Sequence, residues 1–97
     1  PDPRAPQPSF DCAKSNTAIE YAICGDWKLA RADRQMADDY AQALEYALEP
    51  KEKRQLVADQ RAWLRARNRS CERAKDVESC VMPLIAQRRA RLAKQKE

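Results

Sequence analysis

The sequence predicts an all-α fold: a small bundle of one short and three longer helices, cross-linked by two local disulfides. Only one of the 97 residues is Gly, 35% are charged, and residue types that favour helices dominate. Apolar residues recur at helical spacing in four separate stretches. The four cysteines form two pairs, with eleven and eight residues between the partners.

The chain divides into a leader and one domain. Residues 1–9 hold four of the six prolines, so we expect a flexible, Pro-rich leader there. Residues 10–97 have the size of a single helical domain. The chain opens without the apolar core of a signal peptide, and no apolar run is long enough to span a bilayer. We therefore expect a mature N-terminus and no transmembrane segment.

The short helix is expected from Thr17 to Cys24. Thr17 and Glu20 have the spacing of a capping box, in which the Glu20 side chain bonds back to the backbone of Thr17. Gly25 follows, as Gly often does beyond a helix end.

The longest helix is expected from about Trp27 to Leu48, with Asp26 as its N-cap. Pro50 marks the break before the next helix. The apolar side of the long helix is formed by Leu29, Met36, Tyr40, Ala43, Leu44 and Ala47.

Two further helices are expected at about residues 51–68 and 77–94, joined by a polar connection over residues 68–78. The last helix either begins near Met82, or begins earlier and is kinked by Pro83. The apolar sides of these two helices are formed by Leu56, Val57, Gln60, Trp63 and Leu64, and by Val81, Leu84, Ile85 and Leu92.

The four cysteines predict structural disulfides rather than a metal site. The chain has no His, and neither cysteine pair has the short spacing of a zinc knuckle. A Cys12–Cys24 bond would close a loop of about a dozen residues, and Cys71 and Cys80 can close a second small loop. Disulfides indicate an oxidising compartment. The alternative is a cytosolic protein with reduced, buried cysteines.

Three charged residues, Asp33, Arg67 and Arg88, fall on the apolar sides of the predicted helices. A charge that faces a core needs a partner. We therefore expect Asp33 to pair with one or both arginines where the helices meet, and Gln60 to complete the network. We interpret this set as a structural polar core that fixes helix register.

Neither an enzyme nor a cofactor-binding protein is expected. The chain lacks His and a Gly-rich phosphate loop. The neighbouring carboxylates Asp38 and Asp39 would point in different directions on a helix, as parts of an exposed polar face.

The charge is unevenly distributed along the chain. Residues 1–50 hold five basic and nine acidic groups, and residues 51–97 hold fourteen basic and six acidic groups. The basic half carries no nucleic-acid-binding motif and no aromatic residues interleaved on its basic face, so we expect no nucleic-acid partner. A basic protein that binds anionic polymers is an alternative of third rank.

The candidate residues for binding a partner are aromatic or cationic. Trp27 is the first candidate, because Trp and Arg are enriched in binding hot spots. Lys28 and Arg31 are close enough to share its surface, and Arg65 and Arg69 offer further cations. The alternative for Trp27 is a local clasp over the first disulfide loop.

The stretches FDCAKSNTAIEYAIC, ADRQMADDY and QRAWLRARNRSC, followed by a fourth Cys and R-x-x-x-L, resemble the LprI-type lysozyme inhibitor domain family. The resemblance extends from Phe10 to Leu92 and implies a helical, periplasmic or secreted domain with Cys12–Cys24 and Cys71–Cys80 bonds. The sequence departs from the family pattern at Trp27, where a smaller residue or Pro is common. The matching positions are Cys12, Cys24, Asp33, Tyr40, Gln60, Trp63, Cys71, Cys80, Arg88 and Leu92.

The resemblance implies a non-enzymatic protein of the bacterial envelope that binds and inhibits c-type (animal) lysozyme and so protects peptidoglycan. The cleft of that enzyme carries two catalytic carboxylates. Lys28, Arg31 or an arginine within residues 65–73 could insert there and pair with them. The alternative is a periplasmic interaction or adaptor module, or an immunity protein against another cell-wall hydrolase.

Overall fold

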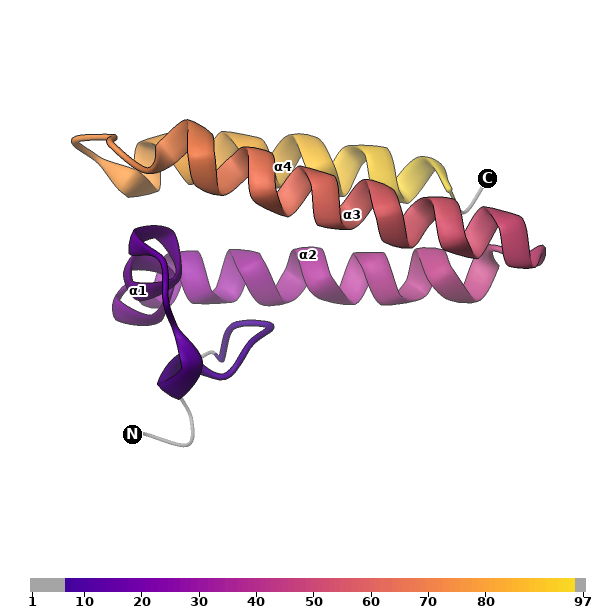
Figure 1. The fold of residues 1–97 in the computed structure, drawn as a ribbon, viewed down its shortest axis with the longest axis horizontal. Helices are drawn as coiled ribbons and strands as arrows, with labels where there is room; N and C mark the ends of the chain where they lie inside the picture. The colour runs from indigo at the N-terminus through magenta and orange to yellow at the C-terminus, as the bar shows by residue number, and fades with distance from the viewer. Residues whose placement is uncertain (1–6, 96–97) are drawn as a thin grey trace.

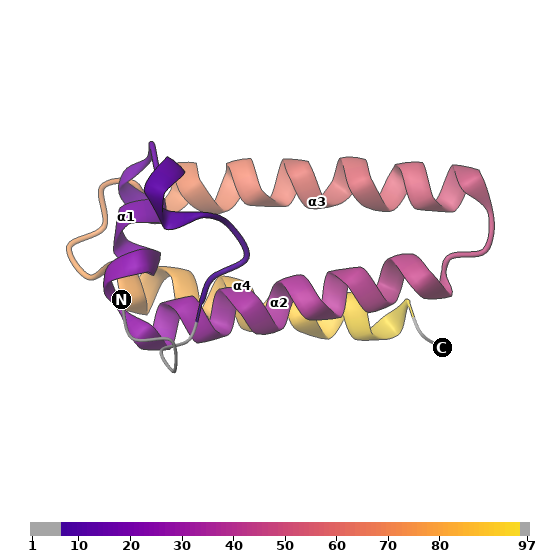
Figure 2. The same ribbon diagram turned by 90° about the horizontal axis from the view of Figure 1, so that it is seen from below.

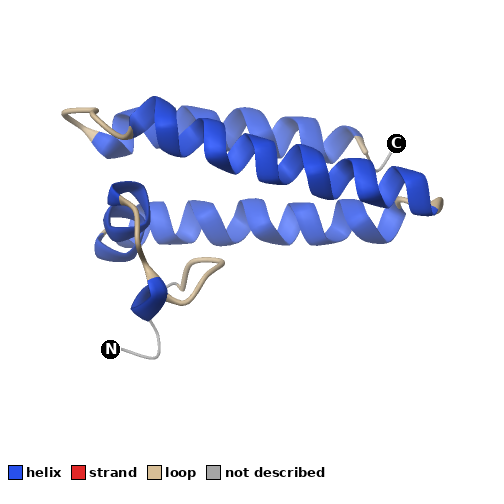
Figure 3. Ribbon diagram, viewed as in Figure 1, coloured by secondary structure: helices blue, strands red, loops and turns tan. Residues whose placement is uncertain are grey.

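In the computed structural model, which describes residues 7–95, all regular structure is helical (Figures 1 and 3). A 3-10 turn, η1 (Cys12–Lys14), precedes the short helix α1 (Ala18–Gly25). Three long helices follow: α2 (Trp27–Tyr46), α3 (Pro50–Cys71) and α4 (Val77–Lys94). The predicted all-α fold of one short and three longer helices is confirmed.

The three long helices run up and down along a common direction and are joined by short connections (Figure 1). In Figure 1, α3 and α4 both lie above α2. The view in Figure 2 shows α3 set apart from α2 and α4. The most extensive packing is between α2 and α4, and α1 contacts α2 and α3 at the end where α2 begins. Within residues 7–95, every helix is too short or too polar to cross a bilayer.

All four helices contribute to one apolar core, and among the three long helices α3 has the fewest buried apolar residues. The only buried apolar residues of α3 are Leu56 and Cys71, and its other buried residues are Gln60 and Arg67. Polar contacts therefore take a large part in attaching α3. The larger apolar residues of the core are Ile19, Ile23, Leu29, Met36, Leu56, Val81, Ile85 and Leu92.

Side-chain caps explain where α1 and α2 begin. The backbone N–H of Glu20 donates to Thr17 Oγ1 at 3.1 Å, as the capping box predicts. The returning bond differs from the expectation, because Glu20 Oε1 accepts from the backbone N–H of Asn16 instead of that of Thr17. Asp26 caps α2 as predicted, with Oδ1 accepting from the backbone N–H of Lys28 at 2.9 Å.

Two helix ends differ from the prediction. The long helix α2 stops at Tyr46, before Leu48, which is 83% exposed and adds nothing to the core. The polar connection expected from Asn68 is wrong at its start, because α3 continues through Cys71. Arg67 and Cys71 lie one turn apart and are both buried, so their burial keeps the last turn of α3 helical.

Pro83 lies inside α4 and does not mark its start. The helix begins at Val77, where Asp76 Oδ1 caps it by accepting from the backbone N–H of Ser79 at 3.3 Å. Pro83 has no N–H to donate to the carbonyl of Ser79, four residues earlier. Both residues are exposed, so water can satisfy that carbonyl.

Two disulfides join neighbouring elements, with the predicted pairing. Cys12–Cys24 ties η1 to the end of α1, with Cα atoms 5.9 Å apart, and Cys71–Cys80 ties α3 to α4, with Cα atoms 5.7 Å apart. Disulfides of this kind stabilise a fold by about 2–4 kcal/mol each.

The last residues of the predicted leader lie against α2. Pro8 is buried, and the guanidinium of Arg34 donates to the backbone carbonyl of Pro8 at 2.7 Å and to that of Gln7 at 3.2 Å. Residues 7–9 of the expected leader therefore contact the helical domain. Residues 1–6 of the expected leader lie outside the described part of the chain.

Candidate functional site

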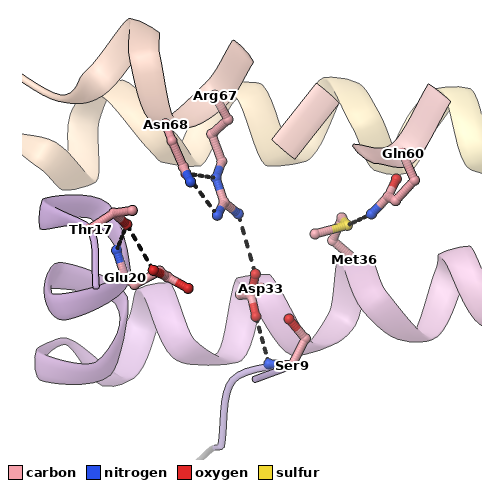
Figure 4. A network of polar contacts seen from close by, with 8 residues as sticks. All are labelled: Ser9, Thr17, Glu20, Asp33, Met36, Gln60, Arg67 and Asn68. Atoms are coloured by element: carbon pink, nitrogen blue, oxygen red, sulfur yellow. Dashed lines mark hydrogen bonds and ion pairs between the residues drawn. The ribbon is translucent and has the colours of Figure 1, made fainter. Parts of the chain in front are cut away.

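A buried ion pair between Asp33 and Arg67 lies at the centre of the polar contacts between α2 and α3 (Figure 4). Arg67 Nη1 is 3.3 Å from Asp33 Oδ1, and both side chains are almost fully buried. The other carboxylate oxygen, Oδ2, accepts a 2.6 Å hydrogen bond from the backbone N–H of Ser9. One buried carboxylate thus connects α2, α3 and the segment that precedes η1.

Arg67 is held on two further sides. Its Nε and Nη2 both donate to Oδ1 of Asn68 at 3.1 Å. Its guanidinium carbon lies 5.4 Å from the centroid of the Trp63 ring, within the range of a cation–π contact. Burial lowers the pKa of Arg67, and the charge and hydrogen bond of Asp33 act in the opposite direction. Arginine stays protonated in proteins, so the contact with Asp33 is an ion pair.

Arg88, the second arginine expected near Asp33, belongs to a separate group. Its Nε donates to Oε1 of Gln60 at 2.8 Å, and Nε2 of Gln60 donates to Sδ of Met36 at 3.0 Å. All three side chains are buried. The structure therefore places Asp33 with Arg67, and Arg88 with Gln60.

These buried polar groups hold the helices in place relative to one another. The carboxylate of Asp33 and the amide of Gln60 are used in contacts between helices, and all four cysteines are in disulfides. Residues 7–95 contain no group of three or more His, Cys, Asp and Glu side chains that could hold a metal ion. The arrangement fixes α3 and α4 relative to α2.

The candidate contact residues on α2 lie in its first turns and are exposed. The side chain of Trp27 is 58% exposed, and Arg31 follows one turn later on the same side of the helix. Nζ of Lys28 lies 3.0 Å from Oε1 of Glu78 on α4. The hydrogen bond and the charge of Glu78 raise the pKa of Lys28. Trp27 and Arg31 are therefore more available to a partner than Lys28.

Arg65 and Arg69 are exposed as well, but the structure does not gather them with the residues on α2. They lie in the last turns of α3 and not in a loop, because α3 extends to Cys71. The buried sides of α2 and α3 face each other through Asp33 and Arg67. The opposite sides therefore point away from each other, and the two sets of cations form separate surfaces.

Two surface features were not predicted. Tyr21 on α1 is 64% exposed, and α1 lies at the end of the molecule where α2 begins (Figure 1). The sequence could have predicted this exposure. Tyr21 is two positions from both Ile19 and Ile23, which are buried, and residues two positions apart face different sides of a helix. The contact of Arg34 with Pro8 joins residues 26 positions apart, and no local pattern marks it.

Both disulfides and the buried polar residues lie within a stretch that matches one protein family. The family model of the lysozyme inhibitor LprI matches residues 11–92, a stretch that includes both disulfides and the buried Asp33, Gln60, Arg67 and Arg88. No curated protein and no solved structure matches the chain. Because the family match covers most of the 97 residues, the chain belongs to the LprI lysozyme inhibitor family.

Proposed function

We propose that the protein is a periplasmic or secreted protein of the bacterial envelope that inhibits c-type lysozyme by direct binding, and so protects peptidoglycan. The observation that carries the proposal is the match to the LprI family model over residues 11–92. The two disulfides support an oxidising location. Under this proposal, the protein binds a folded enzyme outside the cytoplasm.

The first turns of α2, with Trp27 and Arg31, form the proposed contact surface. An exposed Trp beside an Arg combines the two residue types most enriched in binding hot spots. Within residues 7–95, Arg31 takes part in no ion pair, whereas Lys28 is paired with Glu78. Arg31 can therefore meet a new carboxylate without first breaking a contact.

Charge favours α2 over α3 as the contact surface. The sequence of α3 holds seven basic and two acidic residues, whereas α2 holds three basic and four acidic ones. C-type lysozymes are basic, so the outward side of α3 would repel the enzyme. We therefore place Trp27 and Arg31 at the interface in preference to Arg65 and Arg69.

The proposed inhibitory step is occlusion of the substrate cleft. That cleft carries two carboxylates that flank the scissile bond. The planar guanidinium of Arg31 can donate two parallel hydrogen bonds to a carboxylate, and such charge-assisted pairs are strong. Trp27, one turn earlier, would pack beside it and exclude water. Substrate and inhibitor would then compete for the same carboxylates.

A cell-wall lysis assay tests the proposal. The oxidised domain is titrated into c-type lysozyme, g-type lysozyme and a bacterial wall hydrolase, at low and at physiological salt. We expect stoichiometric inhibition of the c-type enzyme alone, at both salt concentrations. Inhibition of only the bacterial hydrolase would support an immunity protein instead. If all three enzymes are inhibited at low salt, and the inhibition is lost at physiological salt, the result would support binding to anionic polymers.

A further inference from the structure

A groove with a volume of about 520 Å³ lies between α3 and α4, toward the end of α4. Its size falls within the range of small-ligand sites, about 300–1,000 Å³. Leu56, Trp63 and Leu92 form an apolar part of its lining, and Arg88, Arg91 and Lys94 bring three positive charges to it. We propose that this groove binds a carboxylate carried on a small apolar body, namely the C-terminal end of a peptide.

The buried guanidinium of Arg88 is the main reason for the proposal. Arg88 is 8% exposed, its Nε is held by Gln60, and its Nη2 is buried without a hydrogen-bond partner in the described part of the chain. Its guanidinium carbon lies 6.0 Å from the centroid of the Trp63 ring, so the group is held at a fixed place in the lining.

Arg67 and Arg88 differ in whether a carboxylate lies beside them. Both arginines are buried beside Trp63, but Arg67 has the carboxylate of Asp33 at 3.3 Å. Within residues 7–95, no carboxylate comes within ion-pair distance of Arg88. Asp59, which also lines the groove, acts on Arg88 only through space. A buried charge without a partner is unfavourable, and a carboxylate matches the two parallel N–H groups of a guanidinium.

The other residues of the groove determine which kind of molecule, bearing a carboxylate, can bind there. The last residue of a peptide bears a carboxylate, a side chain and an amide N–H on one carbon atom. Arg88, the apolar lining and the carboxylate of Asp59 offer one complementary group for each of these. Arg91 and Lys94 are exposed at the groove and add attraction for the anion.

The groove is separate from the surface proposed for lysozyme. Lys28 on α2 is paired with Glu78, and Arg91 lies thirteen residues further along α4, a distance of about 20 Å along a helix. The carboxylate site therefore does not depend on lysozyme inhibition, and either can fail without the other.

Nuclear magnetic resonance titration of the ¹⁵N-labelled full chain tests the site. The probe is N-acetyl-L-leucine, and the matched control is N-acetyl-L-leucinamide, which differs only in lacking the carboxylate. We expect the acid, and not the amide, to shift the Nε–H signal of Arg88 and the indole N–H signal of Trp63. A third probe, acetyl-Leu-Glu-Leu-amide, has only an internal carboxylate and should bind more weakly. If it binds as well as the acid, the assignment to a peptide terminus is overturned.

Two substitutions with the same change in charge locate the site. Arg91→Gln removes a cation from the groove, and Arg61→Gln removes one from the exposed side of α3 outside it. We expect Arg91→Gln to weaken binding of the acid by about two- to fivefold, as for an exposed ion pair. Arg61→Gln should leave it unchanged.

Arg88→Gln should weaken binding by at least about tenfold, the effect of losing a charge-assisted hydrogen bond. If that variant does not fold, the two matched comparisons still decide the matter. The proposal is overturned if the acid and the amide shift the same signals equally, if neither binds in the millimolar range, or if Arg61→Gln weakens binding as much as Arg91→Gln.

Discussion

Asp33 and Arg67 show how one buried ion pair can hold a helix that has few buried apolar residues of its own. Such a pair gives little net stability compared with well-packed apolar residues, but breaking it leaves an unpaired charge in the interior. Asp33 also accepts from the backbone N–H of Ser9, so its loss would loosen the segment before η1 as well.

We therefore predict that Asp33→Ala lowers the free energy of unfolding by about 3–5 kcal/mol, because Arg67 stays buried without a carboxylate. The measurement is urea unfolding followed by circular dichroism. The control is Asp38→Ala in the same helix, where the side chain is exposed and the expected change is within about 0.5 kcal/mol. Equal effects of the two substitutions would contradict a structural role for the pair.

The residues proposed to contact lysozyme can be separated from those that hold the fold. Arg31→Glu should abolish inhibition by repelling the catalytic carboxylates, and Trp27→Ala should weaken it by at least about thirtyfold, as at a binding hot spot. Both residues are exposed, so the thermal unfolding midpoint should stay close to that of the unaltered protein.

The matched control for Arg31→Glu is Arg65→Glu, which makes the same change in charge on the outward side of α3. Inhibition constants from the lysis assay compare the variants. If Arg65→Glu loses inhibition and Arg31→Glu keeps it, the contact surface lies on α3, and the argument from charge is wrong.

The range of α4 agrees with the prediction of a helix at about residues 77–94, although the helix contains a residue that disfavours helical structure. Pro83 lies seven residues into the helix, yet the helix continues on both sides of it. The Asp76 cap and the disulfide at Cys80 fix the first turns independently of Pro83. Helix formation before the proline is thus supported by a local cap and by a disulfide to α3, neither of which is part of the helix propensity of a residue.

We predict that Pro83→Ala raises the free energy of unfolding, by up to about 3 kcal/mol, because alanine restores the hydrogen bond to the Ser79 carbonyl. Chemical denaturation measures the change. The control is Pro50→Ala at the first position of α3, where proline suits the helix and its replacement should bring no gain. No gain from Pro83→Ala would contradict a cost of Pro83 inside α4.

Signals that lie within single stretches of the sequence predicted most of the fold. The caps at Thr17 and Asp26 and the apolar spacing of α2 lie within single elements, so they could be read directly from the sequence. The last turn of α3 was missed because its buried residue beyond Asn68 is Cys71, and the sequence analysis placed that cysteine in a polar connection closed by the second disulfide.

The site was less predictable, because it depends on distances between elements. The sequence narrowed the partner of Asp33 to two arginines, but the choice of Arg67 spans 34 positions and follows from how α3 lies on α2. The groove beside Arg88 likewise arises only from the packing of α3 against α4. No spacing within one helix could have revealed it.

The net charge of +4 sets a condition on any complex with a basic enzyme. Long-range attraction between two basic proteins is unfavourable, so affinity has to come from short-range contacts such as those proposed for Trp27 and Arg31. Binding should therefore persist, or strengthen slightly, as salt screens the repulsion.

Cleft occlusion can be tested by calorimetric titration of c-type lysozyme with the oxidised domain, with and without a saturating chitooligosaccharide in the enzyme's cleft. We predict a one-to-one complex that the oligosaccharide weakens strongly, because both ligands need the same two carboxylates. A domain that does not bind the enzyme would contradict the proposed inhibition. A domain that binds equally well when the cleft is occupied would contradict occlusion of the cleft.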